Sequence, residues 1–275
     1  MAFLNTIFRS LFDLLLLPFE QLAAWIPLTL LGFVLAVLAL LTYKGFSDQD
    51  ALERVKAKIA AGFYEIRLFN DNFGAIMRAL GGLLKNNGIY VALSLVPLFV
   101  MLVPMVFVFA QLQFHYGYHG LKPGEPTTVT LSFDESVNSA TPPQIELAAP
   151  DGVRVESPAV WIPKLRQYAW RVVGEQEGRH QLQWTLAEGQ VDKSLTVTDD
   201  YKRISPVRYA KGFLNQLLYP AEPPIEANLA VSSITVAYEP MAVPFLGMEW
   251  PWWLVFFVTS IVFAFMIRER MGVTF

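Results

Sequence analysis

Residues 88–114 read GIYVALSLVPLFVMLVPMVFVFAQLQF, 27 consecutive residues without Asp, Glu, Lys or Arg. Similar stretches lie before and after it, at Leu22–Tyr43 and Pro251–Ile267. A helix needs roughly 20 apolar residues to cross about 30 Å of hydrocarbon, and a backbone in lipid must satisfy its own hydrogen bonds. The sequence therefore predicts three membrane-spanning helices, over residues 21–43, 88–114 and 250–267.

The charges between these stretches predict the orientation. Residues 44–87 contain seven Lys and Arg residues, and the tail at 268–275 contains Arg268 and Arg270. Basic residues close to the ends of spans favour the cytoplasmic side. Carboxylates outnumber Lys and Arg in residues 115–249, so this insert is expected outside, together with the N-terminus. We expect a multi-pass protein of a cell inner (plasma) membrane.

Composition excludes several classes of function. Hydrophobic residues make up 54% of the chain and the formal net charge is −3. A nucleic-acid-binding protein would need a concentrated basic surface, so nucleic acid is not an expected partner. The chain has no cysteine, which excludes disulfides, zinc–thiolate and iron–sulfur centres and thiol nucleophiles.

The first 20 residues form an amphipathic pattern. On a helix one face would carry Leu4, Ile7, Phe8, Leu11, Phe12 and Leu15. Arg9 and Asp13 interrupt the run, and no basic region or cleavage pattern precedes it, so neither a fourth span nor a signal peptide is expected. We interpret residues 1–20 as an interfacial helix ended by Pro18. The alternative is a helix packed against the outer domain.

The cytoplasmic insert, residues 44–87, has the pattern of a helical hairpin. The segment Ser47-Asp-Gln-Asp50 is a variant of the capping box, and Asn70-Asp71-Asn72 indicates a turn. Apolar residues follow each signal at spacings of three and four: Leu52, Val55, Ile59, Phe63 and Ile66, then Phe73, Ile76, Met77, Leu80 and Leu83. We expect the two stripes to bury each other, as in a short antiparallel coiled coil.

Four basic residues of this hairpin would then remain in solvent: Arg54, Lys58, Arg67 and Arg78. A solvated face that follows the positive-inside rule explains them. The functional alternative is contact with a protein partner or with anionic lipid headgroups.

The second span contains Pro97 and Pro104. Each proline removes an intrahelical hydrogen bond, so we expect a helix kink that either only shapes the helix or opens a cavity between spans. Gln111, Gln113, Thr259 and Ser260 are the polar residues at or near membrane depth, and they could join helices or line a path. No span carries an ionisable residue, so the sequence offers no residues for a proton relay or a voltage sensor.

The outer insert, residues 115–249, is expected to be an all-β domain. Six short runs with partial alternation lie at 127–133, 144–148, 153–156, 168–174, 180–186 and 193–197, which favours an immunoglobulin-like sandwich. We expect Trp161, Trp170 and Trp184 in its core. An amphipathic helix at 208–219 and a last strand at 231–238 would follow.

Catalytic and metal-binding patterns are weak. His115 and His119 have a spacing that could place two imidazoles on one metal ion, but the Tyr and Gly residues around them are more typical of a helix end. Asp134-Glu135 and Asp199-Asp200 could bind calcium weakly, although paired acids in loops are ordinarily solvated. We expect no enzyme activity, cofactor or metal site.

The order of these elements resembles the core of the YidC/Oxa insertase superfamily. The resemblance covers roughly residues 20–114 and the third span. It rests on the Ser47-Asp-Gln-Asp50 start, the amphipathic helices up to Leu84, and the span Val96-Pro-Leu-Phe-Val-Met-Leu-Val-Pro104. It departs from the bacterial members in having no basic residue within a span and in carrying an inserted β-domain. The resemblance implies a role in membrane-protein biogenesis, and no site residue is carried over.

Two functional hypotheses follow. In the first, the protein is a biogenesis factor whose cytoplasmic hairpin receives a client. In the second, it is a scaffold or accessory subunit whose β-domain binds an extracytoplasmic partner. Both imply membrane lipids and one or more protein partners in the membrane or periplasm.

Overall fold

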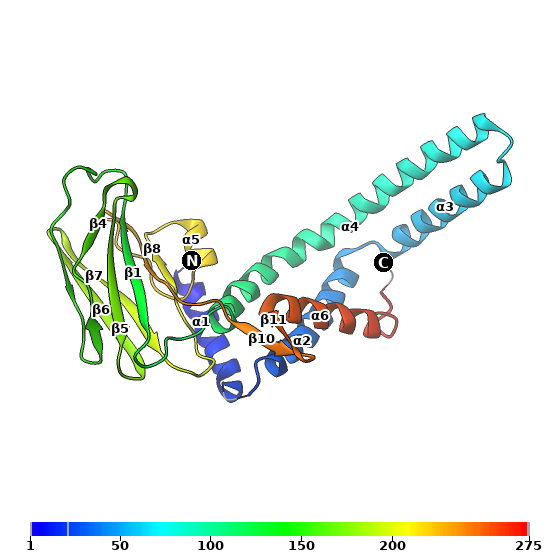
Figure 1. The fold of residues 1–275 in the computed structure, drawn as a ribbon. Helices are drawn as coiled ribbons and strands as arrows, with labels where there is room; N and C mark the ends of the chain where they lie inside the picture. Colours follow the sequence, from blue (N-terminus) through cyan, green and yellow to red (C-terminus); the bar gives the residue numbers. More distant parts are fainter. Residues whose placement is uncertain (1, 21, 274–275) are drawn as a thin grey trace. The chain divides into compact units, whose positions relative to one another are not determined.

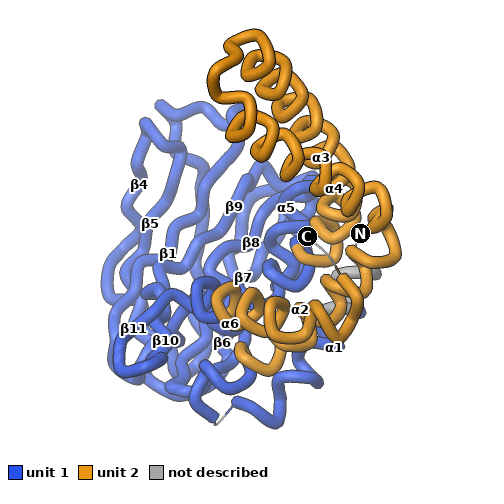
Figure 2. Tube along the Cα trace, turned by 90° about the vertical axis from the view of Figure 1, so that its right-hand side faces the viewer, with its two compact units in different colours: residues 1–27, 106–255 blue, residues 28–105, 256–275 orange. Residues whose placement is uncertain are grey.

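The computed structural model describes residues 2–20 and 22–273 (Figure 1). The chain forms two compact units (Figure 2). Residues 1–27 and 106–255 form the first, which we call the β-unit, and residues 28–105 and 256–275 form the second, which we call the helical unit. Three helices have residues in both: α2 (Trp25–Phe46), α4 (Phe73–Tyr116) and α6 (Trp252–Ile267).

Two helices among the described residues are long and apolar enough to cross a membrane, α2 with 22 residues and α4 with 44. Helix α2 contains residues 25–43 of the first predicted span, and α4 contains the whole of the second. The third predicted span is α6, which is apolar but has 16 residues. At 1.5 Å per residue it is about 24 Å long, which is shorter than an average hydrocarbon core.

Helices α2 and α6 approach each other closely within the helical unit. A Cβ atom added to Gly32 of α2 would lie 2.8 Å from Thr259 Oγ1 of α6, so a larger residue at this contact would require α6 or its side chains to shift. The rings of Phe33 and Phe263 meet edge to face, with centroids 5.2 Å apart. The hydroxyls of Thr259 and Ser260 donate to the carbonyl of Phe256 in their own helix. These two polar residues therefore lie at a contact between helices.

The hairpin consists of α3 (Gln49–Leu68) and the first part of α4, which run side by side (Figure 1). Asp48 is the N-cap of α3 and accepts a hydrogen bond of 2.8 Å from the amide of Ala51. The predicted cap at Ser47 was one residue early, because Ser47 instead donates to the carbonyl of Tyr43 in the preceding helix. The predicted turn is confirmed, and Asn72 caps α4 by accepting from Ala75 N–H at 3.0 Å.

The predicted packing of the hairpin is only partly confirmed. Leu52 and Val55 of α3 and Leu83 of α4 are buried, as expected. Several other members of the predicted stripes are exposed: Phe63, Phe73, Met77 and Leu80. Ala75 and Ala79 are buried in their place. These small residues and Leu83 form the face of α4 toward α3, which turns the larger side chains of α4 outward.

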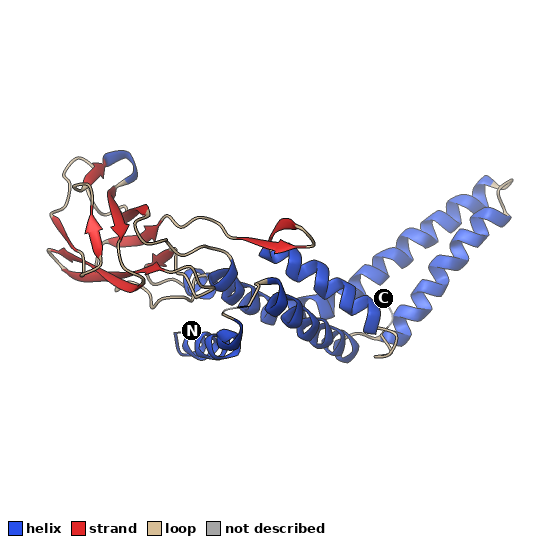
Figure 3. Ribbon diagram, turned by 60° about the horizontal axis from the view of Figure 1, so that its bottom comes forward, coloured by secondary structure: helices blue, strands red, loops and turns tan. Residues whose placement is uncertain are grey.

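Two antiparallel sheets form the β-domain of the β-unit, and a separate two-stranded sheet precedes α6; the strands of all three are red in Figure 3. The six-stranded sheet has the order β3-β5-β1-β9-β8, with β4 also paired to β5. Its strands are β1 (Pro126–Phe133), β3 (Val153–Val155), β4 (Val160–Ile162), β5 (Gln167–Gly174), β8 (Val207–Tyr209) and β9 (Val231–Val236). The three-stranded sheet has the order β2-β6-β7, made of β2 (Ile145–Ala148), β6 (Gly178–Leu186) and β7 (Gly189–Val197).

One hydrophobic core joins the two sheets. Trp170 of β5 and Trp184 of β6 are buried in it, with ring centroids 5.8 Å apart. Trp161 packs against the core through the ring of Phe133 at 6.0 Å. Trp170 and Trp184 thus lie in the core as expected, whereas Trp161 is only partly buried at its edge.

Two segments after β7 differ from the predictions. The helix expected at 208–219 is divided into β8, which pairs with β9, and the short helix α5 (Phe213–Leu218). Before α6, the chain forms a hairpin of β10 (Ala242–Phe245) and β11 (Met248–Pro251) that was not predicted. Its turn residues Leu246 and Gly247 both have positive φ angles, as two-residue hairpin turns require.

Candidate functional site: an ion-pair network and cleft in the β-unit

The N-terminal helix α1 (Ala2–Leu16) is followed by the 3₁₀ helix η1 (Leu17–Phe19), which contains Pro18. Phe12 and Leu16 of α1 are buried. Arg9 and Asp13 are bound to other segments of the β-unit, so α1 packs against the rest of this unit through both apolar and charged residues. The interfacial position expected for residues 1–20 stays a prediction.

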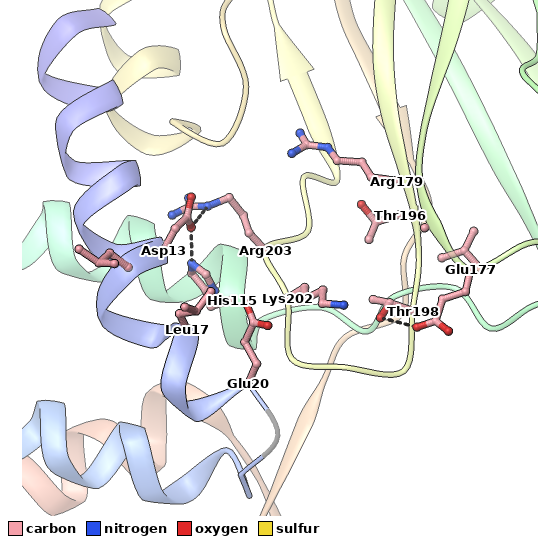
Figure 4. Close-up of a pocket in the computed structure, with 13 residues that line it drawn as sticks. Asp13, Leu17, Glu20, His115, Glu177, Arg179, Thr196, Thr198, Lys202 and Arg203 are labelled. Atoms are coloured by element: carbon pink, nitrogen blue, oxygen red, sulfur yellow. Dashed lines mark hydrogen bonds and ion pairs between the residues drawn. The ribbon is translucent and has the colours of Figure 1, made fainter.

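Arg203, in the segment after β7, is the centre of a polar network (Figure 4). Its Nε donates to Asp13 Oδ1 of α1 at 2.8 Å, and its Nη1 donates to Gln111 Oε1 of α4 at 2.8 Å. His115 Nε2 lies 3.1 Å from the same Asp13 oxygen. The network therefore joins α1, the end of α4 and the segment after β7.

Burial and charge act against each other in this network. The side chains of Arg203 and His115 are 9% and 5% exposed, whereas Asp13 keeps 47% of its side chain in solvent. Burial by itself raises the pKa of Asp13, but the hydrogen bond from His115 and the charge of Arg203 outweigh it and hold the pKa below the usual range. Burial lowers the pKa of Arg203, an effect that the Asp13 carboxylate opposes.

A cleft of about 590 Å³ lies beside the network. Its walls come from α1, the end of α4, the start of β6 and the end of β7 with the segment that follows. Its charged lining residues are Asp13, Glu20, Glu177, Arg179, Lys202 and Arg203 (Figure 4). Thr198 donates to Glu177 across the cleft wall at 3.4 Å. With both signs of charge interleaved, the cleft suits a polar or zwitterionic group better than a strongly charged ion.

A second cluster surrounds Lys193 of β7, whose side chain is fully buried. Its Nζ donates to Glu222 Oε2 at 2.7 Å and to the carbonyl of Ser205 at 2.6 Å. The other oxygen of Glu222 accepts from the amide of Ser194 at 3.0 Å. This cluster fastens the segment that carries β8 and α5 to the edge strand β7.

The charges of this pair depend on each other. Burial by itself raises the pKa of Glu222, but the Lys193 ammonium and the donors of Ser194 hold the pKa below its ordinary value of 4.5. Burial lowers the pKa of Lys193, and the Glu222 carboxylate opposes that effect. Removing either charge would leave the other buried without a counter-ion.

The prolines and the basic hairpin residues singled out from the sequence are not part of the Arg203 network or the Lys193 cluster. Pro97 and Pro104 lie inside α4, which remains one continuous helix. Pro97 is buried and Pro104 is exposed. The helix kink stays a prediction.

The four basic residues of the hairpin are all exposed. Arg54 and Lys58 are one turn apart on α3, whereas Arg67 lies on the other side of that helix at 100° per residue. Arg78 belongs to α4. They therefore do not form a single patch, and their contact with a partner or with lipid stays a prediction.

The residues weighed as metal ligands lie apart. Helix α4 ends at Tyr116, so His115 and His119 do not share a helix, and His119 is exposed. Asp200 is paired with Lys202 at 2.8 Å, and Asp134 accepts from the amide of Ser136. Within residues 2–20 and 22–273 no group of three or more His, Cys, Asp or Glu is arranged to hold a metal ion.

Sequence reasoning missed both clusters, although each left a signal. Lys193 lies between Val191 and Leu195, so the alternation of a strand places it on the buried face. Asp13 lies within an apolar run, where a carboxylate needs a partner. The identity of that partner, Arg203, had no local signal.

No protein-family model and no curated protein matches this sequence at a significant level. Among solved structures, the chain is similar to the S-layer protein SbsC domains 4 and 5, with 15% identity and a TM-score of 0.24. The similarity covers 30% of this chain and 47% of that chain, so this chain spans less than half of that structure. A TM-score this low carries no argument about fold or function.

Proposed function

We propose that the protein is a non-enzymatic, multi-pass membrane protein of the cell inner membrane that assists the insertion of apolar polypeptide segments, as the YidC/Oxa insertase superfamily does. In this proposal α2, α4 and α6 cross the bilayer, the hairpin is cytoplasmic, and the β-unit presents an immunoglobulin-like sandwich outside. A span as short as α6 is accommodated by thinning the bilayer around it, which lowers the barrier for a client.

The observation that carries the proposal is an apolar stripe along α4. Eight large apolar residues are spaced by three, four or seven along the helix and are all exposed: Phe73, Met77, Leu80, Leu84, Val91, Leu95, Leu98 and Leu102. At 100° per residue they fall within a sector of about 60°. The row therefore runs from the hairpin turn into the part of α4 that is apolar enough to span a membrane, with one interruption between Leu84 and Val91, where Asn87 and Gly88 are exposed.

The cytoplasmic part of this stripe needs an explanation. An apolar side chain in the spanning part faces lipid, but Phe73 and Leu84 belong to the hairpin, where exposed apolar residues in a row indicate an interaction surface. Two glycines beside the stripe, Gly81 and Gly88, would meet nothing within 4 Å if they carried a Cβ. They leave space for another helix to approach closely. An apolar client helix fits this surface.

Photo-crosslinking on ribosome-bound nascent chains tests the proposal. A photoreactive amino acid is placed at Met77, Leu84 or Leu98 in the stripe, and at the exposed neighbours Arg78 and Lys85 as controls. We expect crosslinks to an apolar nascent segment from the three stripe positions and few from the controls. Equal yields at all five positions, or none from the stripe, would contradict the proposal.

The cleft in the β-unit favours the second candidate, an accessory subunit that binds an extracytoplasmic partner. Purification under mild detergent separates the two functions. Ribosomes or nascent chains in the purified material support the biogenesis factor, and one stoichiometric membrane or periplasmic partner supports the accessory subunit.

A further inference from the structure

Helix α1 turns its charged side chains inward. Arg9 Nη1 donates to the carbonyl of Ala221 at 3.4 Å, and Asp13 is paired with Arg203. Together with Phe12 and Leu16 these residues form the side that packs against the β-unit. In a surface helix of a water-soluble protein the charged face points to solvent, whereas in α1 the charged residues are bound to other segments of the β-unit and remain only partly exposed.

The opposite side of α1 is apolar. Its described large residues are all exposed: Ile7, Leu11, Leu14 and Leu15, of which Leu14 also lines the cleft. The face they share contains no charged residue among those described. Exposing such a face to water is unfavourable, because the free energy falls when an apolar surface is removed from water.

Helix α5 adds a second apolar surface next to the first. It contacts α1, and Phe213, Leu214 and Leu218 are exposed on it. The following residue, Tyr219, packs its ring on Phe114 at the end of α4, with centroids 6.2 Å apart. The short helix is thus held beside both α1 and the end of a candidate span.

Contacts within the β-unit place this surface beside the ends of the proposed spans α4 and α6. His115, in the last turn of α4, is bound to Asp13 of α1. Trp252, at the start of α6, donates from Nε1 to Gln113 of α4 at 2.9 Å, and its ring packs on Phe109 at 4.8 Å. Aromatic side chains at the ends of apolar helices are typical of the membrane–water interface. Helix α1 is therefore fixed where the proposed spans leave the bilayer.

We propose that α1 and α5 form one platform whose apolar face is immersed in the outer leaflet of the bilayer, so that lipid acyl chains cover Leu14 and Phe213. This inference rests on the membrane location in the proposed function. The platform holds the β-sandwich on the membrane through two ionic contacts, Asp13–Arg203 and Lys193–Glu222. Lipid fits better than protein because both helices of the platform are held beside the end of α4, a candidate span.

The absence of cysteine from the chain makes single-cysteine labelling clean. The full-length protein is labelled with an environment-sensitive fluorophore at Leu14→Cys or Phe213→Cys and reconstituted alone into phosphatidylethanolamine–phosphatidylglycerol vesicles containing nitroxide-labelled lipid. Leu165→Cys is the matched control, because Leu165 is 60% exposed, close to the 61% of Phe213, and belongs to the 3₁₀ helix η2 (Pro163–Leu165) between β4 and β5. Leu98→Cys in α4 reports whether the protein is inserted at all.

We expect nitroxide lipid to quench the labels at residues 14, 213 and 98 several-fold more than the label at residue 165. If residue 98 is quenched but residues 14 and 213 behave like residue 165, the platform is wrong while the membrane location stands. If residue 98 also escapes quenching, the membrane location itself is wrong. Labels at 14 and 213 that are shielded from water-soluble quencher but not reached by nitroxide lipid would show that a second copy covers the surface, which also overturns the proposal.

Discussion

Asp13 and Arg203, 190 residues apart in the chain, form an ion pair of 2.8 Å that attaches the N-terminal helix to the β-unit. The guanidinium also donates to Gln111 at the end of α4. A single side chain therefore links α1, the end of α4 and the segment after β7.

Arg203→Met should release α1. The change leaves Asp13 and Gln111 without their donor, and we expect a loss of about 1–3 kcal/mol of stability, toward the lower end because Asp13 is half exposed. Trypsin should then cleave after Arg9 faster than in the wild type, as measured by mass spectrometry. Arg203→Lys should rescue only partly, because an ammonium lacks the planar fork of donors. Arg154→Met, which breaks an exposed pair with Glu175, is the control and should leave this cleavage unchanged.

Lys193→Met should destabilise the β-unit strongly. The carboxylate of Glu222 would remain buried without a counter-ion, which typically costs about 3–5 kcal/mol. The double variant Lys193→Met/Glu222→Gln removes both charges and should recover a large part of the loss. Thermal unfolding followed by tryptophan fluorescence measures both. A single variant no less stable than the double variant would argue against the buried pair.

Acid should weaken the same contact. The pKa of Glu222 is lower in the folded than in the unfolded chain, so its contribution is fully present above about pH 4.5 and is lost as the pH falls through the folded pKa. Urea midpoints measured from neutral pH downward should fall more steeply for the wild type than for Glu222→Gln below this value. Parallel curves for the two proteins would show that other groups cause the acid sensitivity.

Two glycines of the hairpin should respond in opposite directions to alanine. A Cβ at Gly62 would lie 2.9 Å from two side-chain carbons of Leu83, so Gly62→Ala should force the helices apart and increase proteolysis of the hairpin. At Gly81 a Cβ meets nothing within 4 Å, and Gly81→Ala should stabilise the helix by up to about 1 kcal/mol. Equal protease resistance of the two variants would contradict the packing of α3 on α4.

The proposed orientation has a direct test. A reporter that is active only in the cytoplasm should work when fused after residue 275 or inserted near Asn70. It should be silent when inserted within residues 144–200. The reverse pattern would overturn every assignment of a segment to one side of the membrane.

Much of the secondary structure could be predicted because it depends on local patterns. The strand β5 and the turn that ends at Asn72 each have a signal within a few residues, and the structure confirms both. Prediction from sequence failed where the conformation of a segment depends on a distant strand that pairs with it. Residues 207–209 became a strand instead of a helix because β9 offers hydrogen-bonding partners that no local pattern reveals.

The sequence also did not show which face of a helix is buried. The apolar residues of α4 favoured Phe73, Met77, Leu80 and Leu83 as the contact with α3, yet of these only Leu83 is buried, together with Ala75 and Ala79. Small residues let two helices approach closely, and periodicity alone does not show which of two adjoining faces packs. The exposed stripe on which the proposed function rests follows from this choice.

By itself the sequence determined the long apolar helices, the hairpin turn and most strands, because hydrophobic periodicity and turn residues act over short distances. Tertiary structure alone decided that Asp13 meets Arg203 and that Lys193 meets Glu222. Each pair joins residues far apart in the chain, and a buried charge requires a partner without specifying where in the sequence that partner lies.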